Sequence, residues 1–321
     1  MKKIFVAVMA MAAFAACSNE EQIAAPKGQE IAFGDAFVDN ATKAIYESAD
    51  DITGFTVWGN VKGTGDVVAL YGDTGANVTR NSEELDAAWN CDVVRYWTPS
   101  CDYSFVAIAN GIAAELTNGV PTKIGYTVNA SEPADLIYGA TTAKTDGQSN
   151  PIEGVNSNKV VAFTMQHLLS RVKVSFKNEL DSENATDYRY TISDVKVVTA
   201  GSGTYDIAEN SWALGNEANL SYTGVSPIAN GTTESYGAQL VIPTSPVKLV
   251  FTYALELKTG TDTWTAINSG TVTKESVIAS PVKNNSYNIT VQLKAGAKID
   301  FTVAEENGLT GFGSDSNVNV Q

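Results

Sequence analysis

The chain has 321 residues, of which 44% are hydrophobic and 18% are charged, and its formal net charge at pH 7 is −15. At about 150 residues per domain this length predicts two domains, and the acidity argues against a nucleic-acid partner, whose phosphates require a basic surface. One histidine and three cysteines leave little material for metal sites or histidine-based catalysis, so we expect no cofactor.

The first 17 residues have the pattern of an exported lipoprotein. Lys2 and Lys3 precede an apolar stretch at residues 4–14, which is too short to span a bilayer as a stable helix. Small residues then lead to Cys17, as in a lipobox, where the thiol is diacylated and the chain is cut before it. We therefore expect a signal peptide over residues 1–16 and lipidation of Cys17. An ordinary secretory signal followed by an incidental cysteine is the alternative.

Beyond this leader, the pattern predicts an all-β fold. β-Branched and aromatic residues alternate with polar ones, and short runs rich in Gly, Asn and Pro separate the alternating segments, which is typical of antiparallel sandwiches. The best helix candidate is residues 81–89, with Ser82 as N-cap. The alternation predicts these inward-facing positions: Phe55, Val57, Tyr103, Phe105, Ala107, Val172, Val174, Phe176, Leu249, Phe251, Tyr253, Leu255, Tyr287, Ile289, Val291 and Leu293.

Two cysteines, Cys91 and Cys101, follow the leader, and an exported protein permits a disulfide between them. Residues 92–97 and 103–109 have the pattern of two strands joined by a turn. In a simple hairpin, Cys91 would pair nearer to Ile108 than to Cys101, and that offset could hold the two α-carbons beyond disulfide reach. The sequence therefore leaves the disulfide open.

The hydrophobic pattern changes register close to His167. Apolar residues occupy odd positions up to Leu169 and even positions from Leu168 onward. Such a flip needs a bulge or a strand that passes from one sheet to another, so we place a domain boundary within residues 168–180. The chain has no second histidine and no cysteine nearby. We therefore interpret His167 as a structural residue bonded to backbone.

No motif for enzymatic chemistry stands out. The chain lacks a nucleophile elbow, a phosphate-binding loop and a His-Glu-x-x-His element, so we expect no catalytic and no metal site. A pair of carboxylates acting on glycosides stays open, because such a pair is formed in space. Tryptophans could present a sugar-binding platform, although their strand-like surroundings favour core packing: Trp58, Trp89, Trp97, Trp212 and Trp264.

Motifs spread over most of the chain resemble those of fimbrillins, the subunits of type V pili in Bacteroidota-type bacteria. The most specific is FTMQHLLSRV at residues 163–172, which resembles a Phe-x-His-x-Leu-Ser-Lys/Arg-Val element and includes His167. Further matches, in the family's order, are RYWTP at 95–99 with YSFVA at 103–107, DLIYG at 135–139, residues 195–212 with a central Gly-Thr-Tyr, QLVIP at 239–243 and NSYNI at 285–289. The order and spacing of these motifs make the resemblance specific.

The resemblance implies two tandem transthyretin-like antiparallel β-sandwich domains after a lipoprotein signal peptide. The resulting segments are a signal peptide (1–16), a lipidated leader with a displaceable strand (17–43), an N-terminal sandwich (44–172), a C-terminal sandwich (173–298) and a C-terminal strand and tail (299–321). The resemblance also implies a lipid-anchored, surface-exposed protein of the cell outer membrane, which enters a fimbrium if it is processed.

The family's assembly scheme implies roles for both ends of the chain. In shaft subunits a trypsin-like surface protease cuts after a basic residue, and a strand from a neighbouring subunit fills the groove left by the removed strand. Lys43 and Ala44 would flank the cut here, with Lys in place of the more frequent Arg, although Lys43 as an ordinary loop lysine is the alternative. Residues 30–37 alternate as a displaceable strand should. Three residues alternate either as in a donor strand or as in the last strand of their own domain: Ile299, Phe301 and Val303.

These observations predict a structural subunit of a surface fimbrium that is not an enzyme. Its partners would be other pilin subunits, the outer membrane through the lipid on Cys17, and the processing protease. The alternative is a non-polymerising outer-membrane lipoprotein that binds glycans or host ligands, motivated by Trp89, Trp97 and Trp264. Shaft, tip and anchor roles all stay open.

Overall fold

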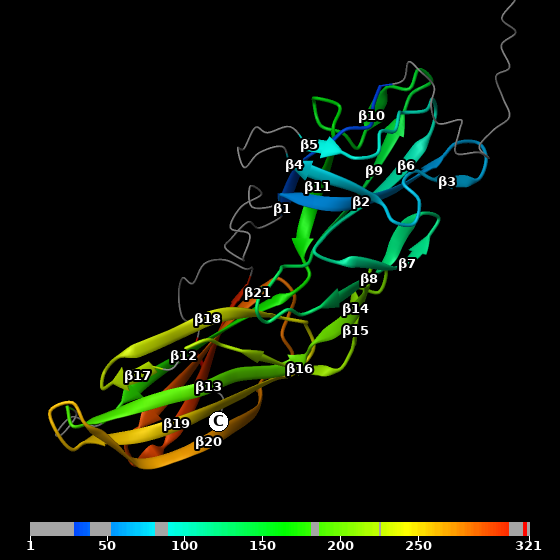
Figure 1. Ribbon diagram of the computed structural model, residues 1–321. Coiled ribbons are helices and arrows are strands. Elements are labelled where there is room, and N and C mark those ends of the chain that lie inside the picture. The colour runs from blue at the N-terminus through cyan, green and yellow to red at the C-terminus, as the bar shows by residue number, and fades with distance from the viewer. Residues whose placement is uncertain are drawn as a thin grey trace, which may run out of the picture.

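The computed structural model describes residues 29–38, 53–80, 89–180, 186–224, 226–307 and 317–319. These residues form 23 strands and one short 3-10 turn, Ala295–Ala297, in an elongated molecule (Figure 1). The all-β prediction is therefore confirmed. Within the same residues, no helix is long and apolar enough to cross a membrane. The predictions for the signal peptide, Cys17, Lys43, Ala44 and residues 81–88 of the helix candidate fall outside the described residues.

One end of the molecule is a nine-stranded sheet, here called the N-terminal sheet (Figure 1). Its strands follow the order β1 (Phe33–Val38), β11 (Val161–His167), β9 (Ile137–Thr145), β6 (Asp102–Ala109), β2 (Gly54–Lys62), β4 (Ala76–Arg80) and β5 (Trp89–Cys91), with β10 (Pro151–Glu153) beside β9 and β3 (Val67–Ala69) beside β2. The β1–β11 pair is parallel and the others are antiparallel. Its core includes Phe33, Phe55, Phe105 and Phe163.

The other end is a sandwich of two five-stranded sheets around one core. The first C-terminal sheet has the order β18 (Thr233–Val241), β12 (Ser170–Glu179), β21 (Asn285–Lys294), β22 (Ile299–Asn307) and β23 (Asn317–Asn319). The second C-terminal sheet has the order β16 (Glu217–Ser221), β13 (Tyr188–Ala200), β19 (Val247–Lys258) and β20 (Trp264–Ile278), with β17 (Ser226–Ala229) beside β13. Phe176 and Phe251 come from opposite sheets and meet edge to face, with ring centroids 4.9 Å apart.

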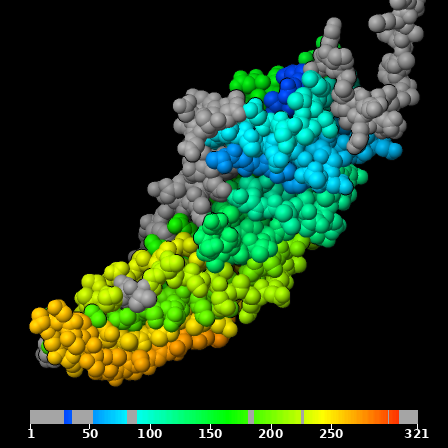
Figure 2. Space-filling model, in the orientation of Figure 1, coloured from blue at the N-terminus to red at the C-terminus, as the bar shows by residue number. Residues whose placement is uncertain are grey.

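A four-stranded sheet, here called the bridging sheet, lies between the two ends (Figure 1). Its order is β15 (Ser211–Leu214), β14 (Ser202–Asp206), β8 (Val120–Thr127) and β7 (Ile112–Thr117). Since β8 precedes the expected boundary at residues 172/173 and β14 follows it, the two halves share a sheet through five β8–β14 residue pairs. Figure 2 shows the continuous surface that results, from the blue N-terminal strands to the orange C-terminal ones.

The predicted change of register is confirmed, and its cause is a chain that passes between sheets. β11 pairs with β9 and β1, whereas β12 pairs with β18 and β21. The two residues between these strands, Leu168 and Leu169, are both fully buried. The side-chain alternation therefore restarts in a new sheet, because each sheet buries its own face.

The predicted inward-facing residues are buried, except that Tyr253 is only half-buried. The hairpin expected from residues 92–97 and 103–109 is wrong. β6 pairs with β2 and β9 instead. Residues 95–97 form backbone hydrogen bonds with residues 29–31: Ile31 N–H donates to Arg95 O at 2.8 Å, and Trp97 N–H donates to Gln29 O at 3.0 Å. Local alternation could not reveal a backbone partner more than sixty residues earlier.

Candidate functional site: the groove of the leading strand

Residues 29–38, here called the leading strand, include β1 and lie between β11 and residues 95–97; the space that they occupy there is here called the groove of the leading strand. On one side β1 pairs with β11 in parallel, with Phe33 opposite Val161, and Val161 N–H donates to Ala32 O at 2.8 Å. On the other side, residues 95–97 supply the two backbone hydrogen bonds described above. The leading strand is thus held along both edges by backbone groups that would be left unpaired without it.

The side chains of Ile31 and Phe33 point into the core, with exposed fractions of 2% and 4%. The Phe33 ring lies 5.6 Å from that of Phe105 in an edge-on geometry and 6.1 Å from those of Tyr71 and Phe163. These three aromatic residues form what we call the Phe33 pocket. Burying an aromatic side chain here is worth a few kcal/mol (about 1.5–3 for area alone), so the leading strand is attached mainly by its side chains.

Tyr71 and Arg95 support the wall of this groove. Burial raises the pKa of Tyr71 above its ordinary value, so its hydroxyl stays neutral, and within the described chain that hydroxyl has no hydrogen-bond partner. Arg95 Nε donates to Leu70 O at 2.6 Å, and its guanidinium lies 5.9 Å from the centroid of the Tyr71 ring. The backbone carbonyl of the same Arg95 accepts the hydrogen bond from Ile31, so Arg95 holds the wall with its side chain and the leading strand with its backbone.

The three residues named as a possible donor strand lie in β22. This strand pairs with β21 over nine consecutive residues, and β23 lies along its other edge. Val303 is buried with an exposed fraction of 7%, whereas Ile299 and Phe301 are half-buried against the C-terminal core. The structure therefore places Ile299, Phe301 and Val303 in a sheet of their own half of the chain.

The cysteines lie far apart in the N-terminal sheet, and no disulfide joins Cys91 to Cys101. Cys91 pairs with Val78 of β4, which in turn pairs with Phe55 of β2. Cys101 comes just before Asp102, which pairs with Lys62 at the other end of β2. Seven residues of β2 separate these levels, which is on the order of 20 Å along the strand, well beyond the span of a disulfide. Cys91 Sγ instead donates to Val93 O, and Cys101 Sγ to Pro99 O, both at 3.3 Å.

His167 pairs with a carboxylate, so the expectation of a backbone partner was wrong. Its Nδ1 lies 2.6 Å from Asp135 Oδ2, and both side chains are buried. The other oxygen, Asp135 Oδ1, makes no hydrogen bond within the described part of the chain. The pair ties the segment before β9 to the end of β11, which carries the leading strand. Since neither side chain reaches solvent, this geometry indicates a structural role.

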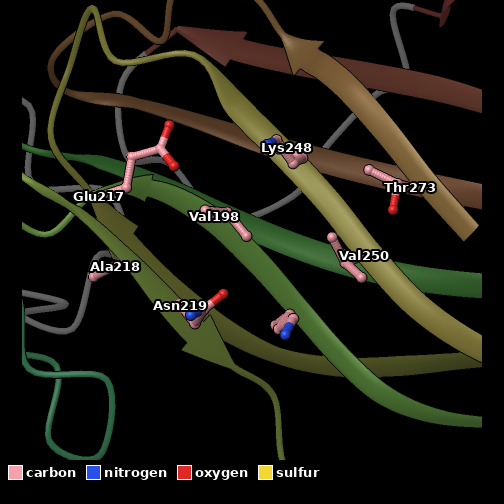
Figure 3. Close-up of a pocket in the computed structure, with 8 residues that line it drawn as sticks. Val198, Glu217, Ala218, Asn219, Lys248, Val250 and Thr273 are labelled. Carbon is pink, nitrogen blue, oxygen red and sulfur yellow. The ribbon is translucent and has the colours of Figure 1, made fainter.

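A second hollow, of about 470 Å³, opens on the outer face of the second C-terminal sheet (Figure 3). The residues that line it include two apolar ones, Val198 and Val250, and three charged ones, Lys196, Lys248 and Glu217. None of the residues that line it is aromatic, so it lacks the flat stacking surface typical of sugar sites. One of its basic groups is also paired with a carboxylate, since Lys248 Nζ lies 3.3 Å from Glu275 Oε2.

The tryptophans that motivated a glycan-binding role contact other side chains of the same chain. Trp97 is buried and meets Tyr103 edge to face, with centroids 4.7 Å apart. Trp89 packs on Phe55 at 5.4 Å, with a guanidinium 4.8 Å from its ring, and Arg189 lies 4.3 Å over Trp264. In the described ranges, no three or more His, Cys, Asp or Glu side chains lie together in a group that could hold a metal ion.

Comparison with known proteins decides the family. The sequence profile of the fimbrillin-like family matches residues 41–307. The chain belongs to the fimbrillin-like family. Fimbrillin-like proteins are fimbrial and cell-adhesion proteins of the cell surface, and they are generally not enzymes. The resemblance found in the sequence motifs is thereby confirmed.

A solved structure shares the fold at low identity. A fimbrial protein from Bacteroides vulgatus is 16% identical to this chain, with a TM-score of 0.55 over 88% of this chain and 99% of that protein. The fimbrial anchor protein Mfa2 from Porphyromonas gingivalis is 11% identical, with a TM-score of 0.42 over 89% of this chain and 99% of that protein. A search of curated proteins gave no match.

Proposed function

We propose that this fimbrillin-like chain is a structural subunit of a cell-surface fimbrium, and that it polymerises by strand exchange in the groove of the leading strand. The observation that carries the proposal is the leading strand itself. It contains the six-residue strand β1, and the side chains of Ile31, just before β1, and of Phe33, its first residue, are buried in the core of the N-terminal sheet. A strand that leaves such a groove exposes unpaired backbone along two edges and an empty aromatic pocket. A second strand of matching pattern satisfies both.

Export and processing would precede this exchange. The chain would be exported as a lipoprotein, attached to the outer membrane through Cys17, with its halves corresponding to the family's two transthyretin-like domains. A trypsin-like protease would cut after Lys43. Since Val38 ends β1, a cut there would release the whole leading strand.

The donor strand is proposed from its spacing. Ile299 and Phe301 are separated by one residue, as Ile31 and Phe33 are, so an incoming strand could place an isoleucine and a phenylalanine where the leading strand had them. In that event β22 has to give up its pairing with β21, and Val303 has to leave the C-terminal core. Exchange would therefore be slow, because β22 must leave its own sheet before it can enter the groove of a neighbouring subunit.

The experiment is limited trypsin digestion of the full chain, followed by N-terminal sequencing and by gel electrophoresis with and without heating in SDS. The expected result is a new N-terminus at Ala44 together with a ladder of SDS-resistant, heat-labile multimers. The matched control is Lys43→Gln, which should keep the leading strand and stay monomeric. A cut protein that remains strictly monomeric would contradict the proposal of polymerisation.

A further inference from the structure

The outer edge of β20 has no partner among the described residues. β20 is the last strand of the second C-terminal sheet, and within this part of the chain it pairs with β19 alone. It runs along the outer margin of the C-terminal half (Figure 1), and Figure 2 shows this margin, in orange, at the surface. From Asn268 to Lys274 its pairing with β19 is uninterrupted over seven residues. The N–H and C=O groups that such a stretch turns outward are free to pair with another strand.

The other edges of the described sheets are short or irregular. β3, β5, β10 and β23 have three residues each, β15 and β17 have four, and β16 has five. β1, β7 and β18 are longer, but their register with the neighbouring strand is interrupted. Short strands and bulges are usual protections of an edge against pairing with another chain. Over its central seven residues, β20 has neither of these protections.

The side chains of this stretch suit pairing with a second copy of β20. Ser269, Thr271 and Thr273 are exposed, and they share one face of the sheet because alternate residues of a strand point the same way. In an antiparallel pair centred on Thr271, that residue faces its own copy and Ser269 faces Thr273. Hydroxyl pairs of this kind are favourable between strands. Lys274 is the one charged residue of the stretch, its Nζ lies 5.5 Å from the centroid of the Phe301 ring, and the antiparallel arrangement keeps its two copies at opposite ends.

The charge of this region allows copies of the chain to approach each other. The β19–β20 hairpin, residues 247–278, contains three lysines and three acidic residues and is therefore neutral: Lys248, Lys258, Lys274, Glu256, Asp262 and Glu275. The whole chain has a formal net charge of −15, so repulsion opposes most other approaches of two copies. A neutral edge has no charge with which to select an acidic or a basic partner, whereas a copy of the same edge meets it without repulsion.

We propose that β20 pairs antiparallel with β20 of a second copy of this chain, so that the two second C-terminal sheets become one continuous sheet. The contact is isologous, with its two-fold axis at Thr271. It joins subunits side by side and is separate from the proposed strand exchange, because the groove of the leading strand lies in the N-terminal sheet. It also inserts no side chain into a pocket. We therefore expect it to separate in SDS and to leave the Lys43→Gln control monomeric on the gel.

Sedimentation equilibrium of the full chain with Lys43→Gln, which keeps the leading strand, tests the proposal without SDS. The mass should rise with protein concentration from that of a monomer toward that of a dimer. Thr271→Glu and Thr271→Lys, each added to this chain, should both stay monomeric, because two like charges then face each other across the axis. An equimolar mixture of the two variants should associate again, since opposite charges then meet. The matched controls are Thr117→Glu and Thr117→Lys, which place the same charges on an exposed threonine of β7 and should associate as the parent chain does.

Three outcomes would overturn the proposal. One is a parent chain that stays monomeric at every concentration. Another is association that both Thr271 variants leave unchanged, which would place the contact elsewhere on the molecule. The third is a mixture of the two variants that stays monomeric, which would exclude a two-fold axis at Thr271. Renewed association of the mixture also shows that both variants are folded, and none of these readings depends on trypsin cleavage or on the multimer ladder.

Discussion

β1 and β22, near opposite ends of the chain, are held in place by different forces. β1 is parallel to β11, and its register with that strand is interrupted between Gly34 and Phe37, whereas β22 has nine uninterrupted antiparallel pairs with β21. Yet Phe33 of the short strand is more completely buried than Phe301 of the long one, since Phe33 is buried and Phe301 is half-buried. β22 is therefore fixed mainly by its backbone, and β1 mainly by a side chain in a pocket. A strand such as β1, which is held mainly by one side chain in a pocket, is easier to replace with another strand of similar pattern.

A large effect is expected from removing the buried His167–Asp135 contact at the end of β11, the strand that pairs with β1. His167→Ala leaves Asp135 buried without its partner, and removing one member of a buried pair costs about 3–5 kcal/mol of the free energy of unfolding. Urea denaturation measures this loss. The double variant with Asp135→Asn, which replaces the carboxyl group that has lost its partner, should recover part of this loss. A loss of under about 1 kcal/mol in the single variant would show that the pair does not stabilise the sheet that carries β1.

The same substitution in both strands sharpens the comparison. Phe33→Ala empties a closed aromatic pocket and should lower the free energy of unfolding by about 3–5 kcal/mol. Phe301→Ala removes a side chain that is already half exposed and should cost about 1–2 kcal/mol. Denaturation of the two variants side by side measures the difference. Equal losses would contradict the assignment of β1 as the strand held by its side chain.

A smaller effect concerns the end of β22 and depends on pH. A hydrogen bond from Lys294, at 2.7 Å, lowers the pKa of Asp300 below its ordinary value. The contribution of Asp300 to stability is therefore present above the pKa of the unfolded chain, and it is lost as the pH falls through the lowered pKa of the folded state. Asp300→Asn should remove this part of the acid dependence. The test is the free energy of unfolding of both proteins from about pH 7 to about pH 3, at low and high salt, because salt screens such an exposed pair.

The sequence was informative wherever the structure follows local alternation. The buried faces of β12 and β21 follow the period of two, whereas β6 is buried on both faces from Phe105 onward. The change of register near Leu168 marks the passage between sheets. It was not informative about partners distant in the chain. The carboxylate that pairs with His167 comes from Asp135, 32 residues earlier, and the hairpin predicted for residues 92–97 failed because their backbone bonds the leading strand instead.

The sequence likewise predicted only part of the candidate site, namely the strand and not the residues that surround it. The alternation of residues 30–37 indicated a strand, and Ile31 and Phe33 are indeed buried, but nothing in the sequence indicated that Tyr71, Phe105 and Phe163 would surround the phenylalanine.

The most direct test of strand exchange is competition by the leading strand itself. Trypsin-cut protein would be mixed with an excess of a synthetic peptide of residues 29–38, and the multimer ladder would be followed by electrophoresis without heating. The account predicts that this peptide abolishes the ladder, and that the same peptide with Phe33→Ala or with a scrambled sequence does not. A ladder that is unchanged by the native peptide would contradict the claim that the groove of the leading strand joins one subunit to the next.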